Sequence, residues 1–295
     1  MSEPESAISA QGEAFLAARW RAPLVAFLLV LACHSWRLGE AHLSGTEGHR
    51  ALPAHRMVVT GDWLVPRFYN QVYLTKPPMH YWVLAAAEAV TGRADEWVWR
   101  LPSALSAAGL AAFLAVMARR WFGPPAGWVS GLSFMMLAAL WSQSRSANIG
   151  SQHTAASVAA GLCLLEIGFG PPGRRRWLWS IAGAASLGAL LLIKGPSGLP
   201  LVLGVLIGGS LFAKRWRWLL RPSLWLSVLG SAAVFGAWAL AVYVSVRLGL
   251  IEPQEGGLQS GVAELKARLF ALYKLPGALL MVVELLAYSL PLFRE

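Results

Sequence analysis

Long apolar stretches alternate with short polar segments along most of the chain. Stretches close to 20 residues in length recur at 22–38, 100–121, 125–143, 147–169, 177–193, 196–213, 223–249 and 276–293. A membrane-spanning helix needs about 20 such residues, so the pattern predicts an all-α polytopic membrane protein with about eight transmembrane helices. One further stretch, 78–91, has only 14 residues and includes His80 and Glu88. We expect it to form a short helix that lies on the membrane surface.

The basic residues predict the orientation of these helices. If 78–91 does not cross the membrane, three short loops on one side hold nine basic residues: Arg119, Arg120, Arg174, Arg175, Arg176, Lys214, Arg215, Arg217 and Arg221. The short loops on the other side hold only Arg145 and Lys194. Because cytoplasmic loops carry an excess of Lys and Arg, we expect a cytoplasmic N-terminal tail, 1–21. A membrane domain, 22–293, then contains a first periplasmic loop with juxtamembrane helices, 39–99, and a second periplasmic segment, 250–275.

The composition agrees with a membrane protein. The chain is 56% hydrophobic and only 14% charged, whereas soluble domains carry about 25% charged residues. The net charge of +10 has no basic run or nucleic-acid motif behind it. Cys33 and Cys163 lie in apolar runs, which favours packing over metal binding or disulfide formation. The chain stops at the end of an apolar run, so we expect a truncated or split product.

Polar residues gather on the predicted outer face, where we look for chemistry. Thr46 is a candidate N-cap, and Glu47 would stand in the first turn of the helix that follows. A stripe of apolar residues on that helix could face the membrane: Ala51, Ala54, Met57 and Val58. Two interpretations of Glu47 stay open, a structural carboxylate that caps the helix and pairs with Arg50, or a catalytic carboxylate.

Three basic residues on the same face are candidates for binding a phosphate. Lys76 precedes the helix that begins near Pro78, and a helix N-terminus favours an anion. The alternative for Lys76 is a snorkelling lysine at the headgroup level. Arg145 and Lys194 either anchor their turns at the membrane interface or bind a lipid phosphate.

Other kinds of site find less support in the sequence. His49 and His55 are six residues apart, so they do not share a helix face, and we expect no histidine metal site. The chain has no Walker motif, no G-x-S-x-G and no G-x-G-x-x-G. A secondary transporter is the alternative to an enzyme, but transporters place charges at mid-bilayer and contain repeats. Only Glu284 lies deep in a predicted span, and no repeat is visible.

An ordered set of motifs resembles a known family. The motifs are TEGHRA (46–51), TGDWLVP (60–66), YLTKPP (73–78), RLPSAL (100–105) and LIKGPSGL (192–199). Together they look like the N-terminal part of the C-type membrane glycosyltransferases, which are similar to protein O-mannosyltransferases and lipid A aminoarabinose transferases.

The resemblance implies a multi-pass enzyme of the bacterial inner membrane. It would move a hexose or pentose from a polyprenyl-phosphate-linked donor to a lipid, glycan or protein acceptor at the outer face. It also implies that Glu47 is the catalytic base and that Lys76 holds the donor phosphate. On electrostatic grounds, Arg145 or Lys194 would assist Lys76 in stabilising the charge that develops on the phosphate. The remaining outer-loop candidates are His49, Arg50, Asp62, Tyr73 and Asn148. A divalent metal, Mg or Mn, assists some relatives, and the alternative to an active enzyme is an inactive or split remnant.

The chain departs from the family pattern at three positions. The usual Asp-Glu pair is reduced to Glu47, because Thr46 stands at the first position. Asn148 stands where many relatives carry an acidic residue, which argues against a metal site. Thr75 stands where the aminoarabinose enzymes have Glu, which argues against a donor sugar with a basic amine.

Overall fold

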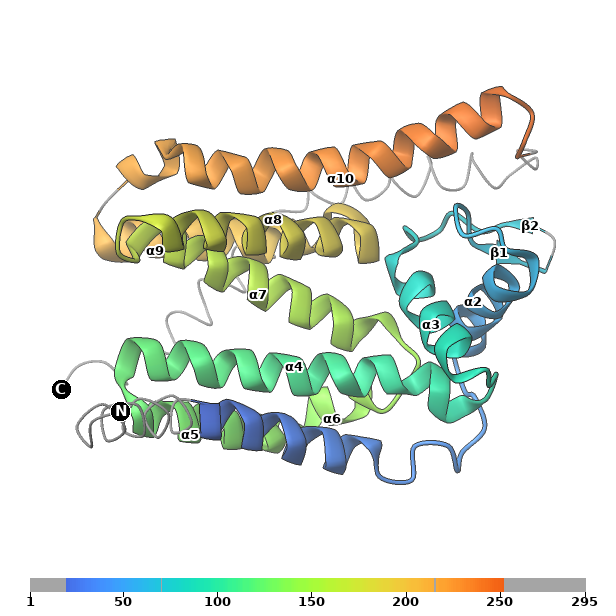
Figure 1. Ribbon diagram of the computed structural model, residues 1–295, viewed down its shortest axis with the longest axis horizontal. Coiled ribbons are helices and arrows are strands. Elements are labelled where there is room, and N and C mark those ends of the chain that lie inside the picture. Colours follow the sequence, from blue (N-terminus) through green and yellow to red (C-terminus); the bar gives the residue numbers. More distant parts are fainter. Residues whose placement is uncertain (1–19, 70, 215, 252–295) are drawn as a thin grey trace, which may run out of the picture.

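The structure, a computed structural model, describes residues 20–69, 71–214 and 216–251. Several expectations fall outside these residues, namely those for most of the N-terminal tail, nearly all of 250–275, and the last span, 276–293, with Glu284. Among the described residues the long helices lie side by side, and short elements gather at one end of them (Figure 1). The long helices are Trp20–Ser35, α4 (Glu96–Phe122), α7 (Ile149–Phe169), α8 (Arg174–Lys194), α9 (Leu199–Ala213) and α10 (Pro222–Arg247).

Three helical segments of the described chain are long and apolar enough to cross a membrane. They are Glu96–Phe122, Arg174–Ala213 and Pro222–Arg247. The second comprises α8, the 3-10 turn η2 (Gly195–Gly198) and α9. Gly195, with φ of 66°, ends α8 and so interrupts the helical segment before α9. The helical membrane architecture expected from the apolar pattern is confirmed at this level.

The stretch 125–143 does not form the single helix that its apolar pattern predicts. It contains α5 (Pro124–Ser133), the 3-10 turn η1 (Phe134–Met136) and α6 (Ala138–Ser144), and the extended backbone of Leu137 separates η1 from α6. Residues 132–143 include no Gly or Pro that would end a helix. Phe134 is buried against the helix Trp20–Ser35 and α4, so tertiary packing interrupts a sequence that could have continued as a helix.

Small residues allow the long helices to pack closely. A side-chain carbon at Gly183 of α8 would come within 3.0 Å of the Ser227 hydroxyl of α10. That hydroxyl donates a hydrogen bond of 2.9 Å to the Ser180 carbonyl. At Gly131 of α5 the same substitution would place a carbon 2.7 Å from Ala26. Interfaces of this kind are typical of helices that associate in lipid.

Basic side chains cluster where α7 ends. Arg120 donates to Glu166 at 2.7 Å, and Arg221 donates to the carbonyls of Ile167 and Gly168 at 2.7 and 2.8 Å. Cations are favoured at a helix C-terminus, where carbonyl groups lack intrahelical partners. Two of the loops predicted to lie on the same side of the membrane therefore meet at the same end of the bundle.

The first outer loop folds into short elements at the opposite end. These are α2 (Gly48–Thr60), the antiparallel hairpin of β1 (Arg67–Phe68) and β2 (Gln71–Val72), and α3 (Met79–Thr91). The short helix predicted over 78–91 corresponds to α3. The apolar stripe of α2 packs with Tyr81 and Leu84 of α3, so the expectation that it faces the membrane is wrong. The hairpin was not predicted, because each strand has only two residues.

The described end of α10 also reaches this loop. The Trp238 indole donates a hydrogen bond of 3.1 Å to the Leu64 carbonyl. Val65, Val242 and Ile251 form a small apolar cluster between the loop and α10. The outer loop is thus held on one side by α4 and on the other by α10.

Candidate active site

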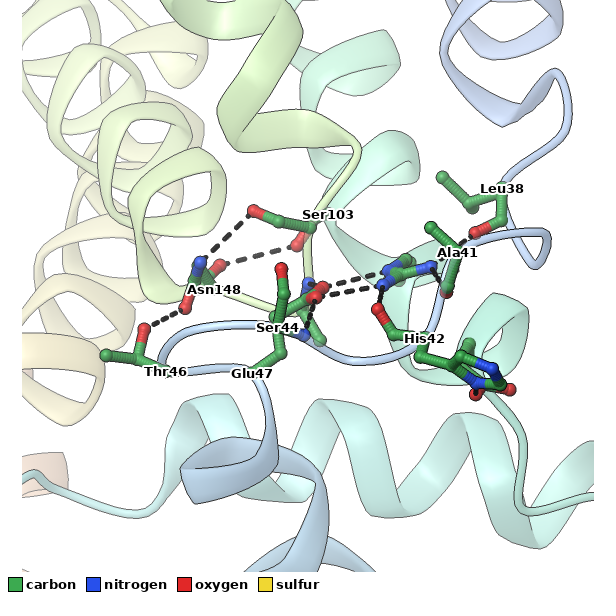
Figure 2. Close-up of polar contacts among 12 residues, drawn as sticks. Leu38, Ala41, His42, Ser44, Thr46, Glu47, Ser103 and Asn148 are labelled. Atoms are coloured by element: carbon green, nitrogen blue, oxygen red, sulfur yellow. Dashed lines mark hydrogen bonds and ion pairs between the residues drawn. The ribbon is translucent and has the colours of Figure 1, made fainter.

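Glu47 lies at the centre of the polar contacts beside α2. Its side chain is 3% exposed and forms a buried ion pair with Arg100 of α4. Arg100 Nε donates to Oε1 at 2.8 Å and Nη2 donates to Oε2 at 2.9 Å, which is the bidentate geometry of a strong pair (Figure 2). The amide of Ala147 donates to Oε1 at 2.7 Å, and the amide of Ser44 donates to Oε2 at 2.9 Å. Each carboxylate oxygen therefore accepts two hydrogen bonds.

The expected pairing of Glu47 with Arg50 is wrong, because Arg100 takes that place. Glu47 stands at the N-cap position of α2, but its side chain makes no capping hydrogen bond. Burial by itself raises the pKa of Glu47, and hydrogen bonds from Arg100, Ser44 and Ala147 together bring that pKa below its usual value. The carboxylate is thus ionised and fully engaged in this arrangement.

Arg100 also fastens the segment that precedes α2. Its Nη1 donates to the carbonyls of Leu38 and Ala41 at 2.8 and 2.7 Å, and its Nη2 donates to the carbonyl of His42 at 3.0 Å. Arg100 had no predicted role, although it belongs to the RLPSAL motif. A charged residue at the start of a predicted span was the available signal, since such residues are rare and need partners.

Thr46 and Asn148 meet beside this ion pair. The Thr46 hydroxyl donates to Asn148 Oδ1 at 2.7 Å, across 102 residues of sequence (Figure 2). The expectation that Thr46 caps α2 is therefore wrong. Two of the three positions at which the chain departs from the family pattern thus form a neutral contact with each other.

Lys76 lies in the turn that leads into α3 and is half-buried. The N-cap of α3 is Pro78, which provides no side-chain hydrogen bond to the first turn. Tyr81 lies in the first turn of α3, and its hydroxyl accepts a hydrogen bond of 2.8 Å from Arg50 of α2. Burial raises the pKa of Tyr81 to about 12, so this hydroxyl stays protonated. Lys76 and Arg50 therefore both flank the N-terminal turn of α3, where backbone amides and the helix dipole favour an anion.

The two further phosphate candidates occupy different places. Arg145 donates to the carbonyl of His34 at 3.1 Å, at the end of the helix Trp20–Ser35, and its guanidinium lies over the Trp141 ring. This contact gives Arg145 a structural role. Lys194 is the last residue of α8, which contacts α3, so it lies at the same end as Lys76.

The remaining outer-loop candidates belong to the hairpin and its neighbours. Asp62 forms an ion pair of 3.1 Å with Arg67 and accepts a hydrogen bond from the amide of Leu64, so it shapes the approach to β1. His49 stacks on Phe68, and Tyr73 packs against Phe68 and Tyr81. His49, Arg50 and Tyr73 are thus brought together near α3, whereas Asn148 approaches from the turn before α7.

Two polar pairs in this region were not anticipated. His80 Nδ1 and Gln152 Oε1 are 2.8 Å apart, and burial lowers the pKa of His80 to about 4, so the ring is neutral at physiological pH. His55 Nδ1 lies 2.6 Å from Glu88 Oε1. Both pairs join helices that are distant in sequence, which a single sequence does not reveal.

The donor set does not fit a divalent metal. In the part of the chain that the structure describes, no three His, Cys, Asp or Glu side chains gather in a group that could hold a metal ion. Glu47 has both oxygens occupied by Arg100 and backbone amides. Asn148, its neighbour in the site, offers an amide in place of a carboxylate, and hard cations prefer carboxylate oxygens.

Comparison with protein families gives one match over more than half of the chain. Residues 75–241 match the model of the family described as dolichyl-phosphate-mannose-protein mannosyltransferase. The matched residues include Lys76, Arg100, Asn148 and Lys194, and they begin after α2, so Glu47 precedes them.

Curated relatives and solved structures agree with this match. The chain is 31% identical over 237 residues to undecaprenyl phosphate-alpha-4-amino-4-deoxy-L-arabinose arabinosyl transferase 2 of Pseudomonas fluorescens, covering 76% of this chain and 41% of that protein. It is 32% identical over 190 residues to the corresponding transferase of Pseudomonas aeruginosa, covering 63% of this chain and 34% of that protein. The structure of ArnT from Cupriavidus metallidurans bound to undecaprenyl phosphate superposes with a TM-score of 0.69 at 26% identity, over 80% of this chain and 43% of ArnT. The chain thus spans about two fifths of the length of these relatives.

Proposed function

Because the chain belongs to the dolichyl-phosphate-mannose-protein mannosyltransferase family, we propose that it transfers a sugar from a polyprenyl-phosphate-linked donor. The acceptor would be a lipid, glycan or protein at the outer face of the inner membrane. The names of the relatives support a polyprenyl phosphate as the carrier, and the related ArnT structure contains undecaprenyl phosphate. These comparisons give no support to a secondary transporter.

The observation that carries the proposal is the cationic environment at the start of α3. Lys76 stands in the turn before the helix, Arg50 contacts the first turn through Tyr81, and the N-cap gives no competing hydrogen bond. A phosphate is the anion that such a set of donors suits, because amides at a helix N-terminus and basic side chains act together on it. We assign the donor phosphate to Lys76, with Lys194 as a second cation from the same end of the bundle.

In this proposal the cations assist departure of the lipid phosphate. Negative charge grows on the bridging phosphate oxygen as the bond to the sugar breaks, and a lysine in a water-poor site stabilises that charge. Arg145 stays a predicted phosphate ligand, but its hydrogen bond to the carbonyl of His34 gives it a structural role as well.

Glu47 stays the predicted general base. A base needs an oxygen within hydrogen-bond reach of the acceptor hydroxyl, and geometry without substrate does not exclude a candidate. In the described arrangement one donor, such as the Ala147 amide, would have to leave before Glu47 accepts a proton. The present contacts therefore support a fastening role for Glu47 together with any catalytic one.

We further propose that the donor sugar carries no basic amine. The contact between Thr46 and Asn148 is neutral, and every carboxylate among the described residues has a basic partner within 4.0 Å. This differs from the aminoarabinose named for the relatives.

The proposed topology places this site on the periplasmic side. Eight spans with a cytoplasmic N-terminus would put the cluster of Arg120, Glu166 and Arg221 in the cytoplasm, as the positive-inside rule favours. The short outer elements α2, α3 and the hairpin would then face the periplasm, where lipid-linked sugars and acceptors would meet.

Binding of undecaprenyl phosphate by the purified protein in nanodiscs tests the proposal. Lys76→Ala should weaken binding by about tenfold or more, because a charge-assisted hydrogen bond contributes about 1.5–3 kcal/mol. Lys76→Arg should retain most of the binding, and Lys214→Ala, at the opposite end, should leave it unchanged. Unchanged binding in Lys76→Ala would show that Lys76 does not hold the phosphate. Binding without transfer of any polyprenyl-phosphate sugar would favour an inactive remnant.

A further inference from the structure

An aromatic ladder runs from the tip of the hairpin to the start of α3. We define it as Tyr69, Phe68, His49, Tyr73 and Tyr81. The ring of Phe68 is central: His49 stacks on it at 4.8 Å with 13° between the planes, Tyr69 meets it edge-on at 4.8 Å, and Tyr73 lies at 5.6 Å. Tyr73 in turn contacts Tyr81 at 6.4 Å.

Exposure decreases along this ladder towards the proposed phosphate site. Tyr69 is 69% exposed at the outer end, Phe68 and Tyr73 are half-buried, and Tyr81 is fully buried at the inner end. The inner end is the residue that holds Arg50, five positions after Lys76. The ladder thus leads from solvent to the place where a lipid-linked phosphate would be bound.

The backbone at Tyr69 is unusual for its residue type. Phe68 pairs with Gln71, so the hairpin loop has two residues, and Tyr69 adopts a φ of 54°. Two-residue hairpins favour Gly, Asn or Asp at positive φ, and a bulky side chain there is unfavourable. An outlier of this kind, with its side chain held in the open, suggests a function for that side chain.

We propose that the ladder is a platform on which a pyranose ring of the donor or the acceptor stacks. The faces of sugar rings carry C–H groups that pack on aromatic faces, while ring hydroxyls need polar partners at the edges. The ladder offers both, since the hydroxyls of Tyr69 and Tyr73 and the His49 imidazole are hydrogen-bonding groups. The ion pair of Asp62 and Arg67 and the exposed Gln71 give the hairpin a polar rim, which favours a carbohydrate over lipid tails.

The inference rests on the proposed function only for the source of the ring. A ring of the donor would reach the ladder from the phosphate at Lys76, and a ring of a glycan acceptor would reach it from solvent. The stacking chemistry is the same for both sources, so two probes are needed. We choose maltoheptaose as a soluble oligosaccharide and undecaprenyl-phosphate glucose as a lipid-linked hexose, with undecaprenyl phosphate as the reference without sugar.

Tyr69→Gly is the informative variant. Glycine suits a φ of 54°, so the substitution removes the ring and relieves the backbone together. We expect its thermal stability to equal or exceed that of the unchanged protein, while affinity for a sugar-containing probe falls about tenfold. A ring that only stabilises the fold would give the opposite result. Tyr69→Phe should keep the affinity, and Trp36→Ala, an exposed aromatic outside the ladder, should not change it.

The two probes distinguish the sources and separate this inference from the proposed function. Loss of maltoheptaose binding in Tyr69→Gly assigns the ladder to an acceptor glycan. If the unchanged protein binds undecaprenyl-phosphate glucose more tightly than undecaprenyl phosphate, loss of that difference in affinity in Tyr69→Gly assigns the ladder to the donor. Unchanged affinity for both probes in Tyr69→Gly overturns the inference, as does an unchanged protein that binds neither sugar. If undecaprenyl phosphate itself does not bind, the proposed function fails, and the maltoheptaose result still decides on the ladder.

Discussion

Replacing Arg100 by Met should destabilise the protein by detaching the outer loop from α4. Methionine fills a similar length with an apolar side chain but removes the cation that pairs with Glu47, which is 3% exposed. Breaking a buried ion pair by removing one partner costs about 3–5 kcal/mol, because the other charge stays buried without compensation. The variant also takes the donors away from the carbonyls of Leu38, Ala41 and His42.

Glu47→Gln is the matched perturbation from the other side of the pair. The amide keeps the size of the side chain and one acceptor oxygen, and Arg100 still donates to three backbone carbonyls. We expect a smaller loss, about 1–3 kcal/mol, from the hydrogen bonds that the amide cannot accept. In a double-mutant cycle, Arg100→Met with Glu47→Met should lose less than the sum of the two single changes, since no charge remains buried.

Thermal unfolding of the purified protein in a mild detergent measures these differences. With about 2–4 °C per kcal/mol for domains of 150–250 residues, Arg100→Met should lower Tm by roughly 6–20 °C. A change in Tm below about 1 °C would refute the idea that this pair fastens the loop. Transfer that is lost in Glu47→Gln with an unchanged Tm would identify Glu47 as a base, whereas parallel losses would identify it as a structural residue.

The same pair predicts a response to acid. The folded-state pKa of Glu47 lies below the reference value of 4.5, so the pair contributes its full stability above that pH. The contribution is lost as pH falls from 4.5 through the lowered folded-state pKa. Glu47→Gln has no carboxylate at this position, so its Tm should fall less steeply over that range.

Three further measurements follow from single residues. Burial lowers the pKa of His80 from 6.5 to about 4, so the unfolded state binds a proton more readily than the folded state. Acidification from pH 7 to 5 should therefore cost about 2 kcal/mol of stability, and the pH dependence of Tm should flatten in His80→Asn. Gly131→Ala should destabilise by about 1–3 kcal/mol, because the new carbon would lie 2.7 Å from Ala26, whereas Gly204→Ala, with no neighbour within 4 Å, should not lower Tm. Trp238→Phe removes the hydrogen bond to the Leu64 carbonyl and should cost about 0.5–1.5 kcal/mol; amide hydrogen exchange near Leu64 should rise, and unchanged exchange would contradict this contact.

Hydrophobic length and charge predict the helices well, because both act within a few turns of the chain. The short helix after Lys76 was expected over 78–91 and is found at Met79–Thr91. The break at Leu137 was not predictable in the same way, because it depends on where Phe134 finds a buried position against other helices.

The sequence predicted which residues belong to the site better than it predicted their contacts. Glu47 and Asn148 were identified as polar residues of the outer face, and the structure places both in one network. Arg100 was missed as the partner of Glu47: its place at the start of a span indicates that it needs a partner, but a single sequence does not reveal a partner 53 residues away. Lys76, Arg145 and Lys194 were predicted to bind a phosphate because all three are cations. Their surroundings, which the sequence does not show, distinguish the structural role of Arg145 from the position of Lys76 beside α3.

The outer loop is attached to the bundle partly through its own backbone carbonyls. Arg100 of α4 binds the carbonyls of Ala41 and His42, and Trp238 of α10 binds that of Leu64. Every residue presents the same backbone carbonyl whatever its side chain, so these particular anchors do not depend on the side chains of Ala41, His42 and Leu64. Residues of the surface that would meet sugars can therefore be exchanged while these anchors to the bundle remain. Substrate preference in such a chain can drift without a loss of fold.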